Sequence, residues 1–536
     1  MTDVFINVYN IIGVFSFLKA NSCFMIRKIR VILAVVAFIC VTLLFLDFSG
    51  VMHHWLGWIA KMQFVPAVLA GNFAIVALVL GVTLLFGRFY CSILCPLGVM
   101  QDGVNFIARK VKKNRFHFVK ENKWLRYPLL VVFVVLLVAG VASIAALIEP
   151  YSAFGRIATN LLQPVYVWIN NILAGIAERH GSYAFYERDV WLKSGVSLAV
   201  AIATLVVVGF LALRRGRTWC STVCPVGTTL GLFSRFALLR PVIDADKCKN
   251  CRQCEKNCKA SCIDIENHRI DYSRCVACMD CLDECKFGAL EYSNTHFRLN
   301  PTKGAESGER KAESGERKAE SVDESKRKFL ATSALVAAAA TVKAQQVKVD
   351  GGLAVVEEKQ IPHRDVALKP AGSQSLNNFS KKCIACQLCV TECPNGVLRP
   401  SSELGSLMQP EMSFERGFCR PECTRCGEVC PAGAIGKVSR EEKSAIHIGY
   451  AVVVPDNCLA YRDDVECGNC ARHCPSEAIV MVERRTENGE RRTENAVKVP
   501  SVNTDKCIGC GACENLCPSR PFSAIYVNGR EKHVVS

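Results

Sequence analysis

Two runs of cysteines between residues 248 and 285 share one spacing. The runs are Cys248, Cys251, Cys254 and Cys258, then Cys275, Cys278, Cys281 and Cys285. In each run two residues separate the first three cysteines and three residues precede the fourth, which is the spacing that holds pairs of [4Fe-4S] clusters. The fourth cysteine of each run binds the cluster of the other run, so Cys258 and Cys285 are expected to be exchanged. Zinc sites use two Cys-x2-Cys pairs rather than two runs of four, and iron-sulfur clusters are therefore favoured.

Four more cysteine runs of the same kind occur in the last third of the chain. Two of these runs keep the standard spacing, one widens the first gap by one residue, and one widens it to eight. Every run ends in Cys-Pro, as this cluster motif does. The four runs are Cys383, Cys386, Cys389 and Cys393; Cys419, Cys423, Cys426 and Cys430; Cys458, Cys467, Cys470 and Cys474; and Cys507, Cys510, Cys513 and Cys517. With the first two runs they predict six [4Fe-4S] clusters, with Cys458 as the least certain ligand.

A different cysteine motif occurs twice, each time after a long apolar run. Its two copies are Gly87-Arg88-Phe-Tyr-Cys91-x3-Cys95-Pro96 and Gly216-Arg217-Thr-Trp-Cys220-x3-Cys224-Pro225. Cysteines four apart share one helical face, so we expect Cys91, Cys95, Cys220 and Cys224 to bind a cofactor. A redox dithiol, half of a four-thiolate metal site and a quinone contact all remain open, and an inert buried pair is the alternative. The three other cysteines, Cys23, Cys40 and Cys262, are expected to be structural.

The elements that position these cysteines include membrane helices. Half of the 536 residues are hydrophobic, and four apolar runs are each close to the ~20 residues that cross a bilayer as a helix. They cover residues 29–46, 64–86, 128–148 and 191–213. The expected fold class is an α-helical membrane domain with four transmembrane helices plus α+β ferredoxin-like domains.

Charge and composition set the expected orientation. The net charge of +16 comes largely from basic clusters at residues 109–126 and 214–217, which is typical of cytoplasmic helix ends rather than of nucleic-acid binding. Residues 325–344 combine a basic start with a short apolar run and resemble a twin-arginine export signal. The expected segments are a membrane domain (1–240), a two-cluster domain (241–295), a charged linker (296–328), the internal signal (325–344) and a four-cluster domain (345–536). In a bacterial inner membrane, the two-cluster domain would be cytoplasmic and the four-cluster domain periplasmic.

This combination resembles two families. Four helices, two Cys-x3-Cys-Pro motifs and a two-cluster segment in residues 20–295 are similar to NapH, the membrane ferredoxin-type subunit of periplasmic nitrate reductase systems. Residues 345–536 resemble NapG, its exported four-cluster partner. The Cys-x3-Cys-Pro motif is also shared by NosR regulators and by polyferredoxins of cytochrome oxidase assembly. The resemblance to NapG implies that Cys517 completes the cluster of the first C-terminal run and Cys393 that of the fourth, with Cys430 and Cys474 exchanged likewise.

The resemblance implies a function in electron transfer. A quinol dehydrogenase module would pass electrons from the quinone pool through the clusters to a periplasmic c-type cytochrome or nitrate reductase. A biogenesis factor that reduces or loads a metal for another enzyme is the alternative. Quinol oxidation needs a proton acceptor, for which Asp47, His53, His54 and Glu149 are candidates. Because a hydrocarbon core of ~30 Å would separate the two cluster sets, the mobile quinone is expected to connect them.

Overall fold

The computed structural model describes residues 22–111, 116–294, 349–350, 354–355, 357–484 and 497–536. The predicted linker and export signal lie outside the described residues, as does the side chain of Cys23. The chain forms two units, residues 1–296 with 360–536, and residues 297–359. The secondary structure described in the second unit is one short hairpin, β5 (Val349–Asp350) with β6 (Ala354–Val355).

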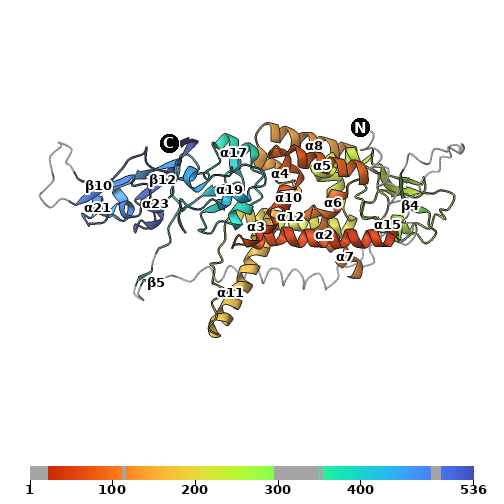
Figure 1. Cartoon of the computed structure of the whole chain (residues 1–536), viewed down its shortest axis with the longest axis horizontal. Coiled ribbons are helices and arrows are strands. Elements are labelled where there is room, and N and C mark those ends of the chain that lie inside the picture. Colours follow the sequence, from red (N-terminus) through yellow and green to blue (C-terminus); the bar gives the residue numbers. More distant parts are fainter. Residues whose placement is uncertain (1–21, 112–115, 295–348, 351–353, 356, 485–496) are drawn as a thin grey trace, which may run out of the picture. The chain divides into compact units, whose positions relative to one another are not determined.

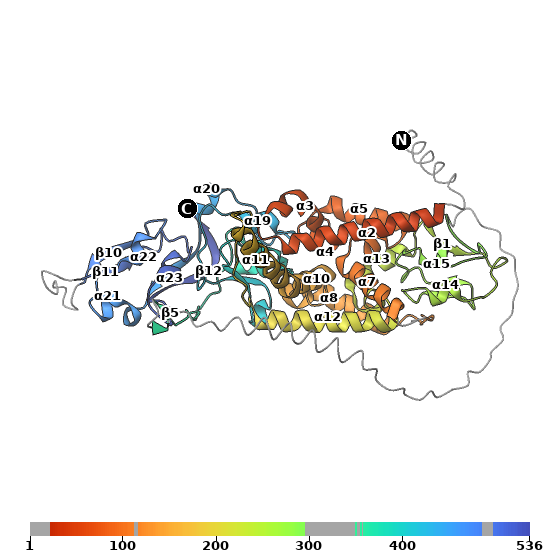
Figure 2. The ribbon, with the colours of Figure 1, turned by 90° about the horizontal axis from the view of Figure 1, so that it is seen from below.

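Two helices are long and apolar enough to cross a membrane, among the residues that the structure describes. They are α2 (Ser22–Leu46) and α12 (Gly195–Arg215). They lie on opposite sides of a bundle that includes α7 (Pro96–Val111) and α10 (Pro150–Ile157) (Figure 2). Only 28% of the apolar stretch of α2 and 22% of that of α12 are buried. Much of their apolar surface therefore faces outward.

The prediction of four continuous transmembrane helices is not confirmed. The apolar run at 64–86 is divided into α4 (Phe64–Leu69) and α5 (Phe73–Phe86), and the run at 128–148 into α8 (Lys123–Val138) and α9 (Ala142–Ala145). Each break contains a glycine in the left-handed region, Gly71 at φ +68° and Gly140 at φ +82°. Glycine adopts this conformation at little cost, so it ends a helix inside an apolar sequence.

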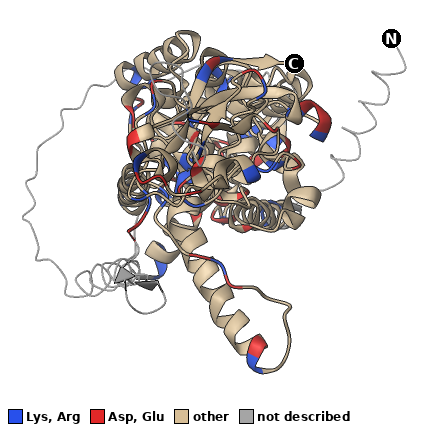
Figure 3. Cartoon of the chain, turned by 90° about the vertical axis from the view of Figure 1, so that its left-hand side faces the viewer, with Lys and Arg blue, Asp and Glu red and all other residues tan. Residues whose placement is uncertain are grey.

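Several helices in this half of the chain were not predicted. The segment from Pro150 to Arg179 is helical throughout, as α10, the π-helix η1 (Ala158–Leu162) and α11 (Gln163–Arg179). Helix α11 extends away from the bundle (Figure 1) and carries charge only at its C-terminal end, on Glu178 and Arg179 (Figure 3). The remaining helices are α3 (Val51–Lys61), α6 (Phe89–Ile93), η2 (Trp219–Val223) and α13 (Pro225–Ser234).

Residues 239–294 form a small α+β module. Strand β1 (Leu239–Ile243) pairs antiparallel with β4 (Leu290–Asn294), and β2 (Ile263–Asp264) with β3 (Arg269–Ile270). Two single-turn helices, α14 (Gln253–Lys256) and α15 (Asp280–Asp283), carry one cysteine from each run. This pattern of two short hairpins and two short helices agrees with the ferredoxin-like fold expected here.

The C-terminal module, from residue 360 onward, repeats these parts. Its antiparallel pairs are β7 (Leu398–Pro400) with β8 (Pro410–Met412), β9 (Ile446–Val453) with β12 (Ile525–Val535), and β10 (Ile479–Glu483) with β11 (Lys498–Val502). Its helices are α17 (Leu376–Lys382), α18 (Leu388–Thr391), α19 (Arg425–Val429), α20 (Arg440–Ser444), α21 (Leu459–Arg462), α22 (Asn469–Arg472) and α23 (Ala512–Leu516). In all six runs, the third cysteine is the second residue of a short helix.

His533 on β12 makes the stability of this module depend on pH. Its side chain is buried and neither ring nitrogen has a hydrogen-bond partner, and burial lowers the pKa of the imidazole to about 4. An unfolded histidine titrates near ~6.5, so the unfolded chain binds more protons between these two values and stability falls as the pH drops through that window. We expect acidification from pH 7.5 to 5.5 to cost about 1 kcal/mol through this group. Thermal unfolding of His533→Leu should lack that part of the pH dependence, and an unchanged dependence would contradict the assignment.

Candidate iron-sulfur sites

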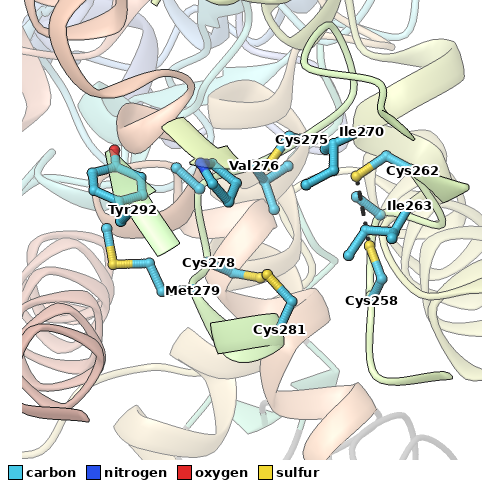
Figure 4. Close-up of a pocket in the computed structure, with 13 residues that line it drawn as sticks. Cys258, Cys262, Ile263, Ile270, Cys275, Val276, Cys278, Met279, Cys281 and Tyr292 are labelled. Carbon is cyan, nitrogen blue, oxygen red and sulfur yellow. Dashed lines mark hydrogen bonds between the residues drawn. The ribbon is translucent and has the colours of Figure 1, made fainter. Parts of the chain in front are cut away.

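The cysteines of residues 248–285 surround two cavities. Ring 1 consists of Cys248, Cys251, Cys254 and Cys285. Ring 2, which Figure 4 shows, consists of Cys258, Cys275, Cys278 and Cys281. Each fourth cysteine therefore lies with the three cysteines of the other run, as the spacing predicts, and the binding of a cluster by each ring stays a prediction. The two rings adjoin, since Cys254 lies within electrostatic range of Cys281.

Cys262 is a fifth thiol beside ring 2, where the sequence suggested only a structural residue. Its sulfur lies 3.5 Å from that of Cys258 and lines the same cavity. The hydrogen bond from Cys262 lowers the pKa of the Cys258 thiol to about 7. Cys262 therefore favours the thiolate form that a metal ligand needs. Its position four residues after Cys258 was the only signal in the sequence.

The C-terminal cysteines also form rings, but not with the predicted partners. Ring 3 is Cys383, Cys386, Cys389 and Cys430; ring 4 is Cys393, Cys419, Cys423 and Cys426; ring 5 is Cys474, Cys507, Cys510 and Cys513; and ring 6 is Cys458, Cys467, Cys470 and Cys517. The expectation that the outer runs exchange with each other, and the inner runs likewise, is wrong. Neighbouring runs exchange instead, as in residues 248–285, because each hairpin-containing half folds as its own two-cluster unit. Cys458 is a member of ring 6 despite its wide gap.

The rings of the C-terminal module follow one another in space. Cys389 of ring 3 lies within electrostatic range of Cys426 of ring 4. The backbone N–H of Cys419 in ring 4 donates to the carbonyl of Cys510 in ring 5 at 2.9 Å. Cys513 of ring 5 lies within range of Cys470 of ring 6. The order along the module is therefore ring 3, ring 4, ring 5 and ring 6.

The dimensions of the rings fit clusters better than single ions. Rings 1, 2, 3, 5 and 6 each line a cavity. Among the described residues, no group of three or more cysteine, histidine or carboxylate side chains converges tightly enough for one metal ion. A zinc ion holds its sulfur ligands at ~2.3 Å, whereas a cluster keeps them well apart. Backbone N–H groups also point at ring sulfurs, from Ala478 to Cys474 and from Ala524 to Cys517, both at 3.3 Å.

The two Cys-x3-Cys-Pro motifs meet at one place in the bundle. Their four cysteines are all buried, and Cys224 lies within electrostatic range of the other three. We call Cys91, Cys95, Cys220 and Cys224 the four-thiol site. The expectation that each pair shares a helical face holds only in part: Cys91 and Cys220 lie in α6 and η2, whereas Cys95 and Cys224 follow those helices and directly precede α7 and α13.

Ring 2 and ring 3 contact the bundle at different ends of α2. At the N-terminal end, Arg27 forms an ion pair with Asp280, beside Cys281, at 3.0 Å. At the C-terminal end, a Cβ on Gly155 would lie 2.4 Å from the carbonyl oxygen of Cys386 and 2.9 Å from the ring of Phe45. The side chain of Gln387, which follows Cys386 in the sequence, also donates to Ser197 Oγ at 2.6 Å. Ring 3 therefore also contacts α12.

Comparisons with known proteins match the four-thiol site and parts of the C-terminal module. Family models described as 4Fe-4S binding domains match residues 69–114 with 196–243, and residues 379–399, and a 4Fe-4S dicluster domain matches residues 465–520. Ferredoxin-type protein NapG of Escherichia coli is 33% identical over 184 residues, which are 32% of this chain and 77% of NapG. Methylamine utilization ferredoxin-type protein MauM of Methylorubrum extorquens is 35% identical over 186 residues, 33% of this chain and 80% of MauM. The chain belongs to this family of ferredoxin-type proteins. No solved structure matches it.

In this ferredoxin-type iron-sulfur protein, the four candidate proton acceptors differ in environment. Asp47 accepts hydrogen bonds from the N–H groups of Ser49 and Met52 and so caps the turn before α3. His54 contacts Trp55 with its ring. His53 is partly buried, with Nδ1 unpaired. Glu149 is buried at the N-terminus of α10, within electrostatic range of Cys386. Of the four, Glu149 is the least exposed, and it lies directly within electrostatic range of a ring cysteine.

Proposed function

We propose that this chain is a fusion of NapH-like and NapG-like halves that serves as the redox subunit of a quinol dehydrogenase. It would take electrons from quinol in a bacterial inner membrane. It would deliver them through six [4Fe-4S] clusters to a periplasmic c-type cytochrome or nitrate reductase. Iron-sulfur clusters supply one-electron transfer, and the protein tunes it through hydrogen bonds and burial.

The contacts at the two ends of α2 are the observation that carries the proposal. Arg27, which holds ring 2 through Asp280, and Phe45, which adjoins ring 3 at Gly155, are eighteen residues apart on one helix. At 1.5 Å per residue this is about 27 Å, close to the ~30 Å of a hydrocarbon core. The arrangement supports ring 2 on one face of a membrane and ring 3 on the other.

The surface of the bundle supports its insertion in lipid. Large apolar side chains are more than half exposed along both long helices, including Ile32 and Val36 on α2 and Val206 on α12. Water-soluble proteins rarely expose such continuous apolar surface, whereas lipid tails solvate it. The basic segment at 109–126 also contacts the module of rings 1 and 2, through Arg109 on the carbonyl of Asn257 at 3.0 Å. Basic segments favour the cytoplasmic side, so rings 1 and 2 would be cytoplasmic.

Reporter fusions test this orientation. A reporter joined after Asn294, the last residue of the module of rings 1 and 2, should indicate the cytoplasm. A reporter joined after Ser536, the last residue of the C-terminal module, should indicate the periplasm, because the two modules contact opposite ends of α2. Alkaline phosphatase and a fluorescent protein that folds only in the cytoplasm give opposite readouts at each position. If both junctions report the same side, the chain does not carry electrons across the membrane.

A further inference from the structure

The four-thiol site is built from two copies of one motif that exchange their arginines. Arg88 of the first copy donates to the carbonyl of Cys220 in the second at 2.8 Å. Arg217 of the second copy donates to the carbonyl of Cys91 in the first at 2.7 Å. Both arginines are fully buried. The reciprocal contacts fix the two motifs against each other, and all four cysteines lie within electrostatic range of one another.

Two glycines make this close approach possible. A Cβ on Gly98 would lie 2.6 Å from the carbonyl oxygen of Cys91, and one on Gly227 would lie 2.1 Å from that of Cys220. The N–H of Gly227 donates to the sulfur of Cys224 at 3.3 Å, and that of Gly98 to Cys95 in the same way. The first N–H groups of a helix have no intrahelical partner, so those of Gly98 and Gly227, at the starts of α7 and α13, are available to the sulfurs. Backbone N–H groups directed at sulfur stabilise thiolates.

The buried charge at the site requires an anion. Arg88 has no carboxylate partner among the described residues; its guanidinium contacts the carbonyls of Ser273 and Cys220 and lies 3.8 Å from the sulfur of Cys91. Arg217, by contrast, is paired with Asp102 at 2.7 Å. An unpaired buried cation is costly. Four protonated thiols or two disulfides would leave Arg88 uncompensated, whereas an iron-sulfur cluster with four thiolate ligands carries a net negative charge.

We infer that Cys91, Cys95, Cys220 and Cys224 together hold one iron-sulfur cluster, a seventh centre in addition to rings 1 to 6. Two independent observations agree with it. The matched segments 69–114 and 196–243 of one 4Fe-4S binding model contain these four cysteines and no others. Arg88 also bonds to the carbonyls of Ser273 and Arg274, directly before Cys275 of ring 2. The seventh centre therefore adjoins ring 2 on the side of the bundle, and its presence does not depend on quinol as the donor.

The seventh centre lies closer to ring 3 along α2 than ring 2 does. Arg30 on α2 donates to the carbonyl of Ser92, next to Cys91. From Arg30 to Phe45, which adjoins ring 3, is fifteen residues or about 22 Å of helix. The sequence predicts a whole hydrocarbon core between the two cluster sets. A centre inside the bundle would reduce the distance between neighbouring clusters.

Iron analysis of the full-length chain, purified anaerobically in detergent, tests the inference. Six cubane clusters account for about 24 irons per chain, and the seventh centre adds about four, or about two if it is a [2Fe-2S] cluster. The double variant Cys91→Ser, Cys220→Ser should lose only this increment of iron and acid-labile sulfide, with a matching loss in the Mössbauer spectrum. Cys40→Ser, a change at a cysteine of α2 outside every ring, should lose none.

Two results would overturn the inference. Wild-type protein with about 24 irons has no seventh cluster, and this measurement decides the matter even if the double variant does not fold. A folded double variant with the iron content and Mössbauer spectrum of the wild type would show that the four cysteines bind none of the iron.

Discussion

Replacing Cys386 with alanine is expected to abolish the reduction of rings 4, 5 and 6 by quinol while dithionite still reduces them. Ring 3 rests directly on the bundle, at Gly155 and Ser197, and the other rings of the C-terminal module follow it in order. Removal of one of its four ligands breaks the series at its first member. The measurement is EPR of the C-terminal clusters in membranes after addition of a menaquinol or ubiquinol analogue.

Cys470→Ala is the matched control for this experiment. Cys470 belongs to ring 6, which lies at the far end of the series from the bundle. Its loss should remove one cluster signal and leave the quinol reduction of rings 3, 4 and 5 intact. Equal reduction of rings 4 and 5 in both variants would mean that electrons enter the module elsewhere than at ring 3.

Glu149→Gln is expected to slow quinol-driven reduction by on the order of 100-fold or more, the usual contribution of a general base. Glu149 is 2% exposed, and its carboxylate accepts the N–H of Ser152 at the start of α10. It lies within electrostatic range of Tyr90, which adjoins the four-thiol site, and of Cys386 in ring 3. Glutamine keeps an oxygen for the helix cap but cannot take up a proton at neutral pH. Cluster content should be unchanged.

Asp47→Asn separates proton transfer from helix capping. Asp47 is also a buried carboxylate that accepts N–H groups at a helix start, from Ser49 and Met52. Asparagine keeps an oxygen that can accept these N–H groups, so the variant should retain near wild-type quinol reduction if Glu149 is the proton acceptor. Equal rates in the Glu149 and Asp47 variants would show that Glu149 is not the proton acceptor.

Local spacing explains what the sequence could predict about the site. A run of cysteines two and three residues apart determines a turn and a short helix, so ring 1 and ring 2, including the exchange of Cys258 and Cys285, followed from the spacing alone. The partners of Cys393, Cys430, Cys474 and Cys517 depend on which runs fold together. Hairpins such as β7 with β8 determine which runs fold together, and the spacing of the cysteines does not predict these hairpins.

The membrane half shows the same division between local and distant information. Apolar length predicted α2 and α12, but Gly71 and Gly140 interrupt the other two runs. The repeated motif located the four buried cysteines, yet the crossed contacts of Arg88 and Arg217 join segments more than a hundred residues apart. Arg217 counted in the sequence as a marker of the cytoplasmic side. In the structure the Arg217 side chain is buried and forms an ion pair with Asp102. Its positive charge therefore has a structural role as well.

Quinol reduction of the wild-type chain tests the central proposal most directly. The purified protein is placed in lipid nanodiscs under anaerobic conditions, a reduced quinol analogue is added, and the C-terminal clusters are followed by freeze-quench EPR. We predict that their reduced signals appear with quinol, reach the intensity obtained with dithionite when a cytochrome acceptor is absent, and decline when oxidised c-type cytochrome is added. Clusters that dithionite reduces but quinol leaves oxidised would contradict a function as a quinol dehydrogenase subunit.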